Sequence, residues 1–235
     1  MRTWARLGRP PAPAAEGYAR ARLPRGRTPW REARYCVVDL ELSGLDPKTG
    51  EIISFGAVPI DGGVIGVGRS LYGLARPTRP LPQASIVVHH IRSIDLDGAP
   101  RLDDAIAPLL GAMAGRVLIA HSASVERTFL GAALRRQGVR LREPVLDTAL
   151  LGRLLLVERG EAPPRPVSLG QLAAALGLPE HRPHHALSDA LTTAQVFLAI
   201  ASHLDKHRPE TVGSLARAAS RLENARHYSP RRPGA

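Results

Sequence analysis

The feature that most constrains this chain is a short apolar run with two acidic residues at its end. Residues 35–42 read YCVVDLEL, and a Ser-Gly pair follows directly. Two β-branched valines followed by this pair predict a buried strand that ends in a turn. Because side chains alternate along a strand, Asp39 and Glu41 point to the same face, about 6.5–7 Å apart along the backbone.

Two carboxylates on one face of a buried strand are costly to keep charged unless a cation lies between them. A divalent metal ion would offset both charges, since hard cations take oxygen ligands. In the alternative interpretation the strand simply ends in solvent, and Asp39 and Glu41 are hydrated. The pair alone does not decide between the two, so the choice depends on what lies downstream.

Composition indicates a globular protein with one large domain. The chain has 235 residues and is 44% hydrophobic, which is enough for a buried core. Its single cysteine, Cys36, lies in the predicted strand, which excludes a disulfide framework and favours a reducing cytoplasm. No apolar run reaches the length of a membrane span, and the first residues lack the apolar core of a secretory signal.

The net charge of +11 is confined to the two ends of the chain. Residues 1–34 hold nine arginines and two glutamates, and residues 203–235 hold seven basic and three acidic residues. The stretch between them has 16 basic and 16 acidic residues. Basic ends on a neutral domain suggest attraction to a polyanion, nucleic acid first, and a solubilising role for the ends is the alternative.

The chain divides into three parts. Residues 1–34 are rich in Pro, Ala, Arg and Gly without apolar periodicity, which predicts a disordered basic tail. Residues 35–203 are predicted to form the folded domain, and residues 204–235 a basic, partly helical extension.

Within the domain, the pattern changes from strands alone to strands alternating with helices. Three strands come first, and the Asp-Gly-Gly turn between the last two predicts a hairpin, so the three form an antiparallel meander. These strands cover residues 35–42, 51–60 and 64–72. A proline-rich loop over 76–100 and a helix over 101–114 follow. Short strands at 117–121 and 144–147 then alternate with helices at 124–137, up to 157, 168–177 and 183–203. This order predicts an α/β fold with a mixed five-stranded sheet and helices on both faces.

Acids and histidines gather in three clusters at the ends of these elements. The clusters are Asp39 with Glu41, His121 with Glu126, and His184 with Asp189. Residues 38–45 read VDLELSGL and resemble the D-x-E-T-T-G-L motif of the DnaQ-like (DEDDh) 3′→5′ exonucleases, most of all the branch of the DNA polymerase III epsilon subunit. Residues 184–190 read HHALSDA and match that family's H-x-A-x-x-D-A motif, and residues 52–58 match the strand after the first motif. The resemblance covers residues 35–200.

The middle motif departs from the family. The family usually reads H-N-A-x-F-D, whereas residues 121–126 read HSASVE. Glu126 keeps a carboxylate but moves it outward by one C–C bond, about 1.5 Å. It is predicted to act as an outer ligand, or to leave a weak second metal and a slow enzyme. The alternative is a solvated acid favoured by the helix dipole.

The resemblance implies a ribonuclease H-like domain that hydrolyses phosphodiesters with two divalent ions, Mg²⁺ or Mn²⁺. Asp39 would bridge the ions, Glu41 and Asp189 would complete the first site, and Glu126 would support the second. His184 would take the proton from the attacking water, a task suited to a group that titrates near neutrality. The neighbouring His185 is the alternative base.

The resemblance also implies where the 3′-terminal nucleotide binds. Ser43, Gly44 and Leu45 would contact it, and the glycine would allow a close backbone approach. His121 and Ser122 would line the same pocket, with a capping or packing role as the alternative. Two other pairs of residues have family counterparts. The first pair named below is predicted to belong only to a loop, and the second begins with a helix N-cap. They are His89-His90 and Asp147-Thr148.

The predicted substrate is the 3′ end of a single strand, with DNA favoured and RNA left open. A proofreading or repair role would need a partner such as a DNA polymerase. The alternative from another class is a nucleic-acid-binding relative whose turnover is weakened by the changes at Glu126 and Ser122.

Overall fold

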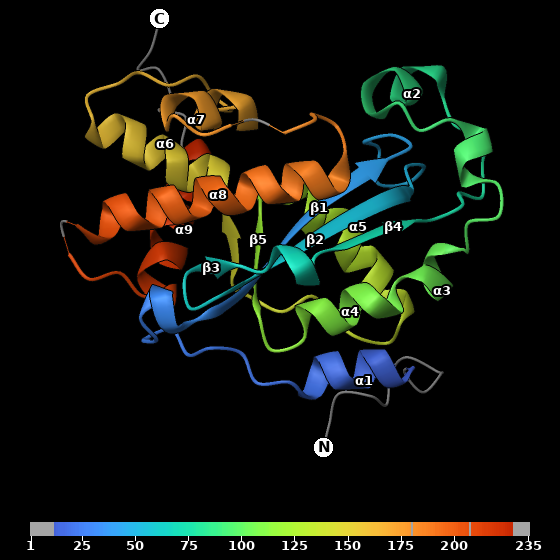
Figure 1. Cartoon of the computed structure of the whole chain (residues 1–235), viewed down its shortest axis with the longest axis horizontal. Coiled ribbons are helices and arrows are strands. Elements are labelled where there is room, and N and C mark those ends of the chain that lie inside the picture. Colours follow the sequence, from blue (N-terminus) through green and yellow to red (C-terminus); the bar gives the residue numbers. More distant parts are fainter. Residues whose placement is uncertain (1–11, 180, 207, 228–235) are drawn as a thin grey trace, which may run out of the picture.

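A computed structural model describes residues 12–179, 181–206 and 208–227. At its centre is a mixed sheet in the order β3-β2-β1-β5-β6, with β4 pairing to β2 on the same edge as β3 (Figure 1). The strands are β1 (Arg34–Leu42), β2 (Ile52–Asp61), β3 (Val64–Ile65), β4 (Leu71–Leu74), β5 (Val117–Ala120) and β6 (Val145–Asp147). β1 runs antiparallel to β2 and parallel to β5, which in turn is parallel to β6. The predicted α/β fold with a mixed sheet is confirmed.

Helices surround this sheet. They are α1 (Pro13–Arg20), α2 (Gln83–His89), α3 (Leu102–Ala105), α4 (Ala107–Met113), α5 (Ser124–Arg136), α6 (Thr148–Glu158), α7 (Leu169–Ala175), α8 (Ala186–Asp205) and α9 (Val212–His227). Three short 3₁₀ helices join them: η1 (Trp30–Glu32), η2 (Val67–Arg69) and η3 (Ser93–Leu96). Among the described helices, none combines the length and hydrophobicity that crossing a bilayer requires.

The third predicted strand is broken in two, so the sheet has six strands rather than five. β3 pairs with the end of β2, β4 pairs with residues 54–57 of β2, and η2 lies between them. The interruption falls opposite Val58 and Pro59. Proline has no N–H to donate to a neighbouring strand, so the ladder along this edge of β2 is discontinuous.

Prolines also explain two differences among the helices. The helix predicted over 101–114 is divided into α3 and α4, because Pro108 in the first turn of α4 has no N–H to donate to the carbonyl four residues earlier. The predicted loop over 76–100 contains α2 and η3. Pro82 is the N-cap of α2, so this proline precedes a helix rather than marking a loop.

The period-two alternation of β1 separates two hydrophobic clusters. Tyr35 and Val37 face one cluster, which is formed with α6, α7, α8 and α9. Cys36 and Val38 face the other, which is formed with α1, α4 and α5. Asp39 continues the odd-numbered face, so its side chain lies on the side of the sheet that α8 covers.

The N-terminal segment is only partly as predicted. Residues 1–11 lie outside the described part of the chain, but residues 12–34 fold against the core instead of forming a disordered tail. Tyr18 of α1 is buried, and its hydroxyl accepts a hydrogen bond from the Arg142 N–H at 3.1 Å. Trp30 is also buried and packs edge-on against Phe197 of α8. A few large anchors order this segment, although it lacks apolar periodicity.

The C-terminal extension also contributes to the core. α9 buries Val212, Leu215 and Ala219 against the cluster on the α8 side of the sheet. Residues 228–235 lie outside the described part of the chain.

Candidate active site

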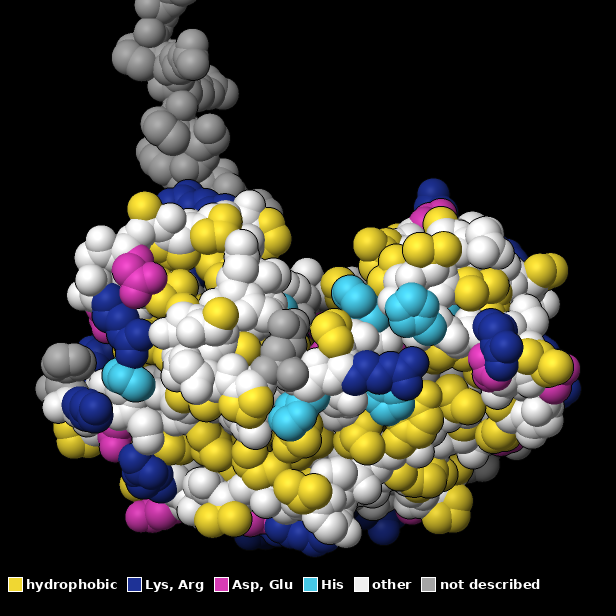
Figure 2. All heavy atoms as spheres, turned by 45° about the horizontal axis from the view of Figure 1, so that its top comes forward, with side chains coloured by type: hydrophobic (Ala, Val, Ile, Leu, Met, Phe, Trp, Pro, Cys, Tyr) yellow, Lys and Arg dark blue, Asp and Glu magenta, His cyan; other side chains and the backbone are white. Residues whose placement is uncertain are grey.

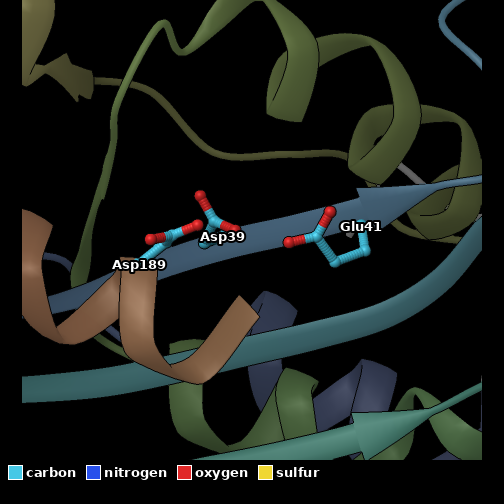
Figure 3. A group of neighbouring side chains, drawn as sticks. All are labelled: Asp39, Glu41 and Asp189. Atoms are coloured by element: carbon cyan, nitrogen blue, oxygen red, sulfur yellow. The ribbon is translucent and has the colours of Figure 1, made fainter. Parts of the chain in front are cut away.

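Three carboxylates from distant parts of the chain meet at the end of β1. Asp39 and Glu41 project from β1, and Asp189 projects toward them from the first turn of α8 (Figure 3). One carboxylate oxygen from each lies within 4.8 Å of the others. The shared strand face predicted for Asp39 and Glu41 therefore places both beside Asp189, an acid from a distant part of the sequence.

The surroundings of these acids disfavour their charged forms. Burial raises the pKa of Glu41 to about 7, and the charge of Asp189 adds to the effect. Burial raises the pKa of Asp39 well above its ordinary value, and the charges of Glu126, Asp189 and Glu41 raise it further. Such a cluster must either take up protons or bind a cation, because like charges at this separation cannot all be ionised cheaply.

Glu126 lies in the first turn of α5, and its side chain is only 3% exposed. Burial is the main reason why the pKa of Glu126 rises to about 8. Its Oε2 atom is buried and has no hydrogen-bond partner among the described residues. The alternative of a solvated helix-end acid is therefore wrong. Glu126 faces inward, close enough to contribute to the raised pKa of Asp39.

These residues fit a divalent cation. The donor set consists of carboxylate oxygens alone, which suits hard ions such as Mg²⁺ and Mn²⁺. The convergence of three acids and the unpaired Oε2 of Glu126 are costly without positive charge nearby. The hydrated-strand alternative for Asp39 and Glu41 does not fit, because Glu41 is 8% exposed and Asp39 is half-buried.

The two adjacent histidines have different environments. His185 is the N-cap of α8, accepts a hydrogen bond from the Ser188 N–H, and stacks on Tyr72 with ring centroids 4.7 Å apart. His184 has an exposed side chain, and its backbone N–H donates to Asp189 Oδ2 at 2.8 Å. The ring of His185 is thus used within the protein, whereas the ring of His184 is free to meet solvent or substrate.

The loop after β1 is hydrogen-bonded to the protein at its start and exposed at its next two residues. Ser43 is buried, and its hydroxyl accepts a hydrogen bond from the Glu51 N–H at 2.9 Å. Leu45 is 75% exposed, and a Cβ at Gly44 would meet no atom within 4 Å. The glycine that this loop requires internally is Gly50, where a Cβ would lie 2.0 Å from the Gly44 carbonyl oxygen. Gly44 and Leu45 are therefore open to a ligand.

The turn between β5 and α5 is fixed from inside. Both ring nitrogens of His121 have partners, Thr148 Oγ1 at 3.1 Å and the Val167 carbonyl at 3.0 Å, so packing accounts for this residue. Ser122 adopts φ 59°, a left-handed conformation that serine takes reluctantly. The N-cap role predicted for Asp147 is confirmed, and its carboxylate also accepts the N–H groups of Ser122 and Ala123. Asp147 thereby holds the turn that positions Glu126.

Two contributors to the site were not among the predicted site residues. The first is Tyr72 of β4, whose ring stacks on the ring of His185. Gly56 pairs with Asp39 across the β1–β2 ladder, and a Cβ at Gly56 would lie 2.3 Å from the Ala186 carbonyl oxygen. The missing side chain lets the first turn of α8 approach the sheet and brings Asp189 to Asp39. A glycine inside a strand is the one sequence signal of such an approach.

Replacing Gly56 with Ala should therefore displace the start of α8. We expect a stability loss of about 1–3 kcal/mol from overpacking and at least ~10-fold weaker Mn²⁺ binding. Thermal unfolding and calorimetric titration would measure the two effects. The matched control is Gly111→Ala in α4, where a Cβ meets nothing within 4 Å. Equal Mn²⁺ affinity in both variants would contradict this role for Gly56.

The raised pKa values also predict how stability depends on pH. Glu41 and Glu126 bind protons in the metal-free folded state up to about pH 7 and 8, whereas their ordinary value is 4.5. Their contribution to stability is fully present below about pH 4.5 and is lost as the pH rises through 7 to 8. With EDTA, the free energy of unfolding should fall by at least ~2 kcal/mol between about pH 5 and pH 8.

Added Mg²⁺ or Mn²⁺ should restore stability mainly at the upper end of this range, where the carboxylates are ionised. Denaturant titrations with and without the metal would measure this. Equal metal stabilisation at both pH values would contradict the assignment of these acids to a cation site.

A surface hollow lies on the side of the molecule where α8 begins. Figure 2 shows this hollow between two rises, one formed by α2 and the other on the side of α7, with histidine side chains along it. The N-terminal end of α8 lies between these two rises in Figure 1. Among the histidines, His89 is buried, and burial together with His90 and His184 lowers its pKa. The loop predicted for His89 and His90 is thus the C-terminal end of α2.

Comparison with known proteins places the site in a family. The family profile described as Exonuclease (RNase T) matches residues 36–197. A DNA polymerase III subunit epsilon-like protein of Rhodobacter capsulatus is 34% identical over 191 residues, which are 80% of this chain and 26% of that protein. A PolC-type DNA polymerase III of Thermotoga maritima is 32% identical over 176 residues, which are 74% of this chain. The chain spans only 12% of that polymerase.

The fold has solved counterparts. Exonuclease X, in complex with 5′ overhanging duplex DNA, superposes with a TM-score of 0.59 at 22% identity, covering 77% of this chain and 99% of that one. The matched residues 36–197 include all four acids of the site and His184. With more than half of its length matched, the chain belongs to the exonuclease (RNase T) family, the DnaQ-like 3′→5′ exonucleases that its motifs resemble.

Proposed function

We propose that this chain is a metal-dependent 3′→5′ exonuclease that hydrolyses phosphodiester bonds at single-stranded ends, with DNA as the favoured substrate. The observation that carries the proposal is the convergence of Asp39, Glu41 and Asp189 oxygens within 4.8 Å beside the buried Glu126. Four acids arranged in this way have little use in a protein that only binds a polyanion, because they would repel the phosphates. Polar or basic side chains would serve binding alone better.

Each acid has a proposed role. Asp39 is central, since its pKa responds to all three of the others, and would bridge two divalent ions. Glu41 and Asp189 would complete the first ion's site, and Glu126, with its unpaired Oε2, would support the second. When bound, the ions would lower the pKa of a water and offset charge on the attacking and leaving oxygens.

His184 is the proposed general base. The side chain of His184 is exposed, and its backbone N–H donates to Asp189, which keeps the residue beside one of the carboxylates. A ring nitrogen would take the proton from the attacking water. The neighbouring ring of His185 caps α8 and would keep the loop in place.

The proposed contacts to the 3′-terminal nucleotide come from the loop after β1. Leu45 offers an exposed apolar side chain to a base, and Gly44 leaves room for a close backbone approach. Ser43 would shape the loop through its bond to Glu51, and Ser122 would border the same space. The packing of His121 makes any effect of that residue on substrate indirect.

The preference for DNA rests on the relatives, whose names are those of DNA polymerase III components. A partnership with a DNA polymerase or a repair protein is proposed on the same ground. A cytoplasmic location is proposed because the one cysteine, Cys36, is a buried free thiol. The basic charge at the chain ends would add affinity for the polyanion.

Parallel digestion of 5′-labelled single strands of DNA and RNA with Mg²⁺ or Mn²⁺ tests the proposal. We expect stepwise shortening from the 3′ end, faster for DNA than for RNA. A substrate with a blocked 3′ end serves as the control and should resist. Binding without shortening would favour the nucleic-acid-binding alternative, and faster RNA shortening would make the chain an exoribonuclease.

A further inference from the structure

A pocket of about 450 Å³ lies beyond the active site, on the sheet face opposite α8. It is bounded by the β1–β2 loop, the end of β4, α3 and α5, and α3 contacts both β4 and α5. Figure 1 shows α3 next to β4 and α5 at one end of the sheet. Four arginines line it, and we call it the basic pocket. They are Arg76, Arg101, Arg135 and Arg136.

The acids that line the basic pocket are already engaged. The Glu51 carboxylate accepts hydrogen bonds from the Thr78 N–H at 2.9 Å and from its hydroxyl at 2.7 Å. Asp103 pairs with Arg136 at 2.9 Å. Arg76, Arg101 and Arg135 have no acidic partner among the described residues. The pocket therefore carries an excess of positive charge.

The backbone brings two of these arginines together. Arg76 and Arg101 form an isolated parallel β-bridge, and the Arg76 N–H donates to the Pro100 carbonyl at 2.8 Å. Neighbouring like charges repel, and the repulsion is stronger beside protein than in bulk water. An anion in the pocket would relieve it. Guanidinium groups match phosphate oxygens in geometry, so a phosphate is the best-suited anion.

The basic pocket and the active site are built partly from the same elements, the β1–β2 loop and α5. Glu51, in the wall of the pocket, exchanges backbone and side-chain hydrogen bonds with Ser43 of the first motif. Thr128 and Phe129, also in its wall, follow Glu126 by two and three positions on α5. A smaller pocket along α5 is lined by Arg127, Arg135, Arg140 and one acid, Glu143, which pairs with Arg127.

We propose that the basic pocket binds a backbone phosphate of the strand whose 3′ end is hydrolysed at the carboxylates. This inference rests on the proposed function and deepens it, since it assigns a second contact to the same substrate. Such a contact lies away from the reacting bond. It therefore contributes to affinity for longer strands and leaves the chemical step unchanged.

The test compares Arg76→Gln, Arg101→Gln, Arg135→Gln with a control triple that removes the same charge elsewhere. The control is Arg69→Gln, Arg159→Gln, Arg165→Gln, three exposed arginines outside both the pocket and the basic ends of the chain. Binding of a single strand of about 20 nucleotides is measured in EDTA over a range of salt concentrations. Hydrolysis of that strand and of a trinucleotide is measured with Mn²⁺.

In the pocket triple, the Kd for the long strand should rise at least ~10-fold, and the slope of log K against log salt should fall by about 2. Turnover of the trinucleotide should match the wild type, and the control triple should change the Kd less than ~3-fold. Equal weakening by both triples, or an unchanged Kd in the pocket triple, would overturn the proposal. Binding is measured in EDTA, where no hydrolysis is needed. A wild type without hydrolytic activity would therefore contradict the proposed function, while the binding data would still test the pocket.

Free inorganic phosphate is the other ligand that the arginines of the basic pocket could bind. Thermal shifts with inorganic phosphate and with the long strand, in the wild type and the pocket triple, separate the two. We expect the strand to stabilise the wild type more than the pocket triple, and inorganic phosphate at the same concentration of phosphate groups to have little effect. Stabilisation by inorganic phosphate alone, lost in the pocket triple, would overturn the assignment to a polynucleotide.

Discussion

The Asp39→Asn, Glu41→Gln double variant should lose at least ~10³-fold in kcat on single-stranded DNA and still fold. Both substitutions keep the shape of the side chain and remove the charge that would hold the ions. Turnover would be measured with a 5′-labelled strand under saturating Mn²⁺. The control, Glu158→Gln with Glu161→Gln, neutralises two exposed acids away from the site and should keep full activity.

The same variant should be more stable than the wild type without metal at about pH 8. The wild-type site then carries buried, mutually repelling carboxylates, because the pKa of Glu41 is about 7. At about pH 5 Glu41 is protonated in the folded wild type, so the difference should shrink. Lower activity together with higher stability would show that the two acids serve function at the expense of stability. Wild-type turnover in the pure double variant would overturn the site assignment.

The second large effect is expected at Glu126, where the chain departs from its family. Glu126→Gln keeps the shape and loses the charge, and should lower kcat by ~10²-fold or more. Removing one member of a group that acts as a unit costs nearly as much as removing several. The matched control is Glu143→Gln, an exposed acid beside α5 that pairs with Arg127. Its activity should stay within ~3-fold of the wild type.

Glu126→Asp restores the residue that the family carries. The aspartate would be shorter by about 1.5 Å in a pocket shaped around glutamate, so we expect activity to be retained and modestly raised. Mn²⁺ should support the wild type at least as well as Mg²⁺, because Mg²⁺ demands nearly ideal octahedral geometry. If Glu126→Gln degrades DNA at the wild-type rate, the working site has three carboxylates, and Glu126 only fills space in the protein.

Local patterns in the sequence were enough to predict most elements of the fold and most of the acids. Strand β1 and the common face of Asp39 and Glu41 follow from apolar run length and the two-residue period of a strand. The cap at Asp147 follows from the tendency of short polar side chains to satisfy free N–H groups at a helix start. These features depend on residues only a few positions apart, so the chain displays them locally.

Pairing and burial between distant segments could not be predicted in this way. The folding of residues 12–34 depends on contacts of Tyr18 and Trp30 with partners more than 100 positions away. The break between β3 and β4 depends on where Pro59 of the neighbouring strand falls. In each case the deciding partner lies on another segment, and the local pattern carries no trace of it.

The site itself shows the same division. The strand pattern alone pointed to Asp39 and Glu41 as a candidate metal pair. The family resemblance was needed to group Asp189 with them. Only the tertiary structure decided that Glu126 is buried with an unpaired oxygen, and that the ring of His185 is engaged while that of His184 is free. Gly56 has the same explanation: its lack of a side chain matters only because α8 crosses β2 at that point. Distances between residues far apart in the chain are set by packing, and packing is a property of the whole fold.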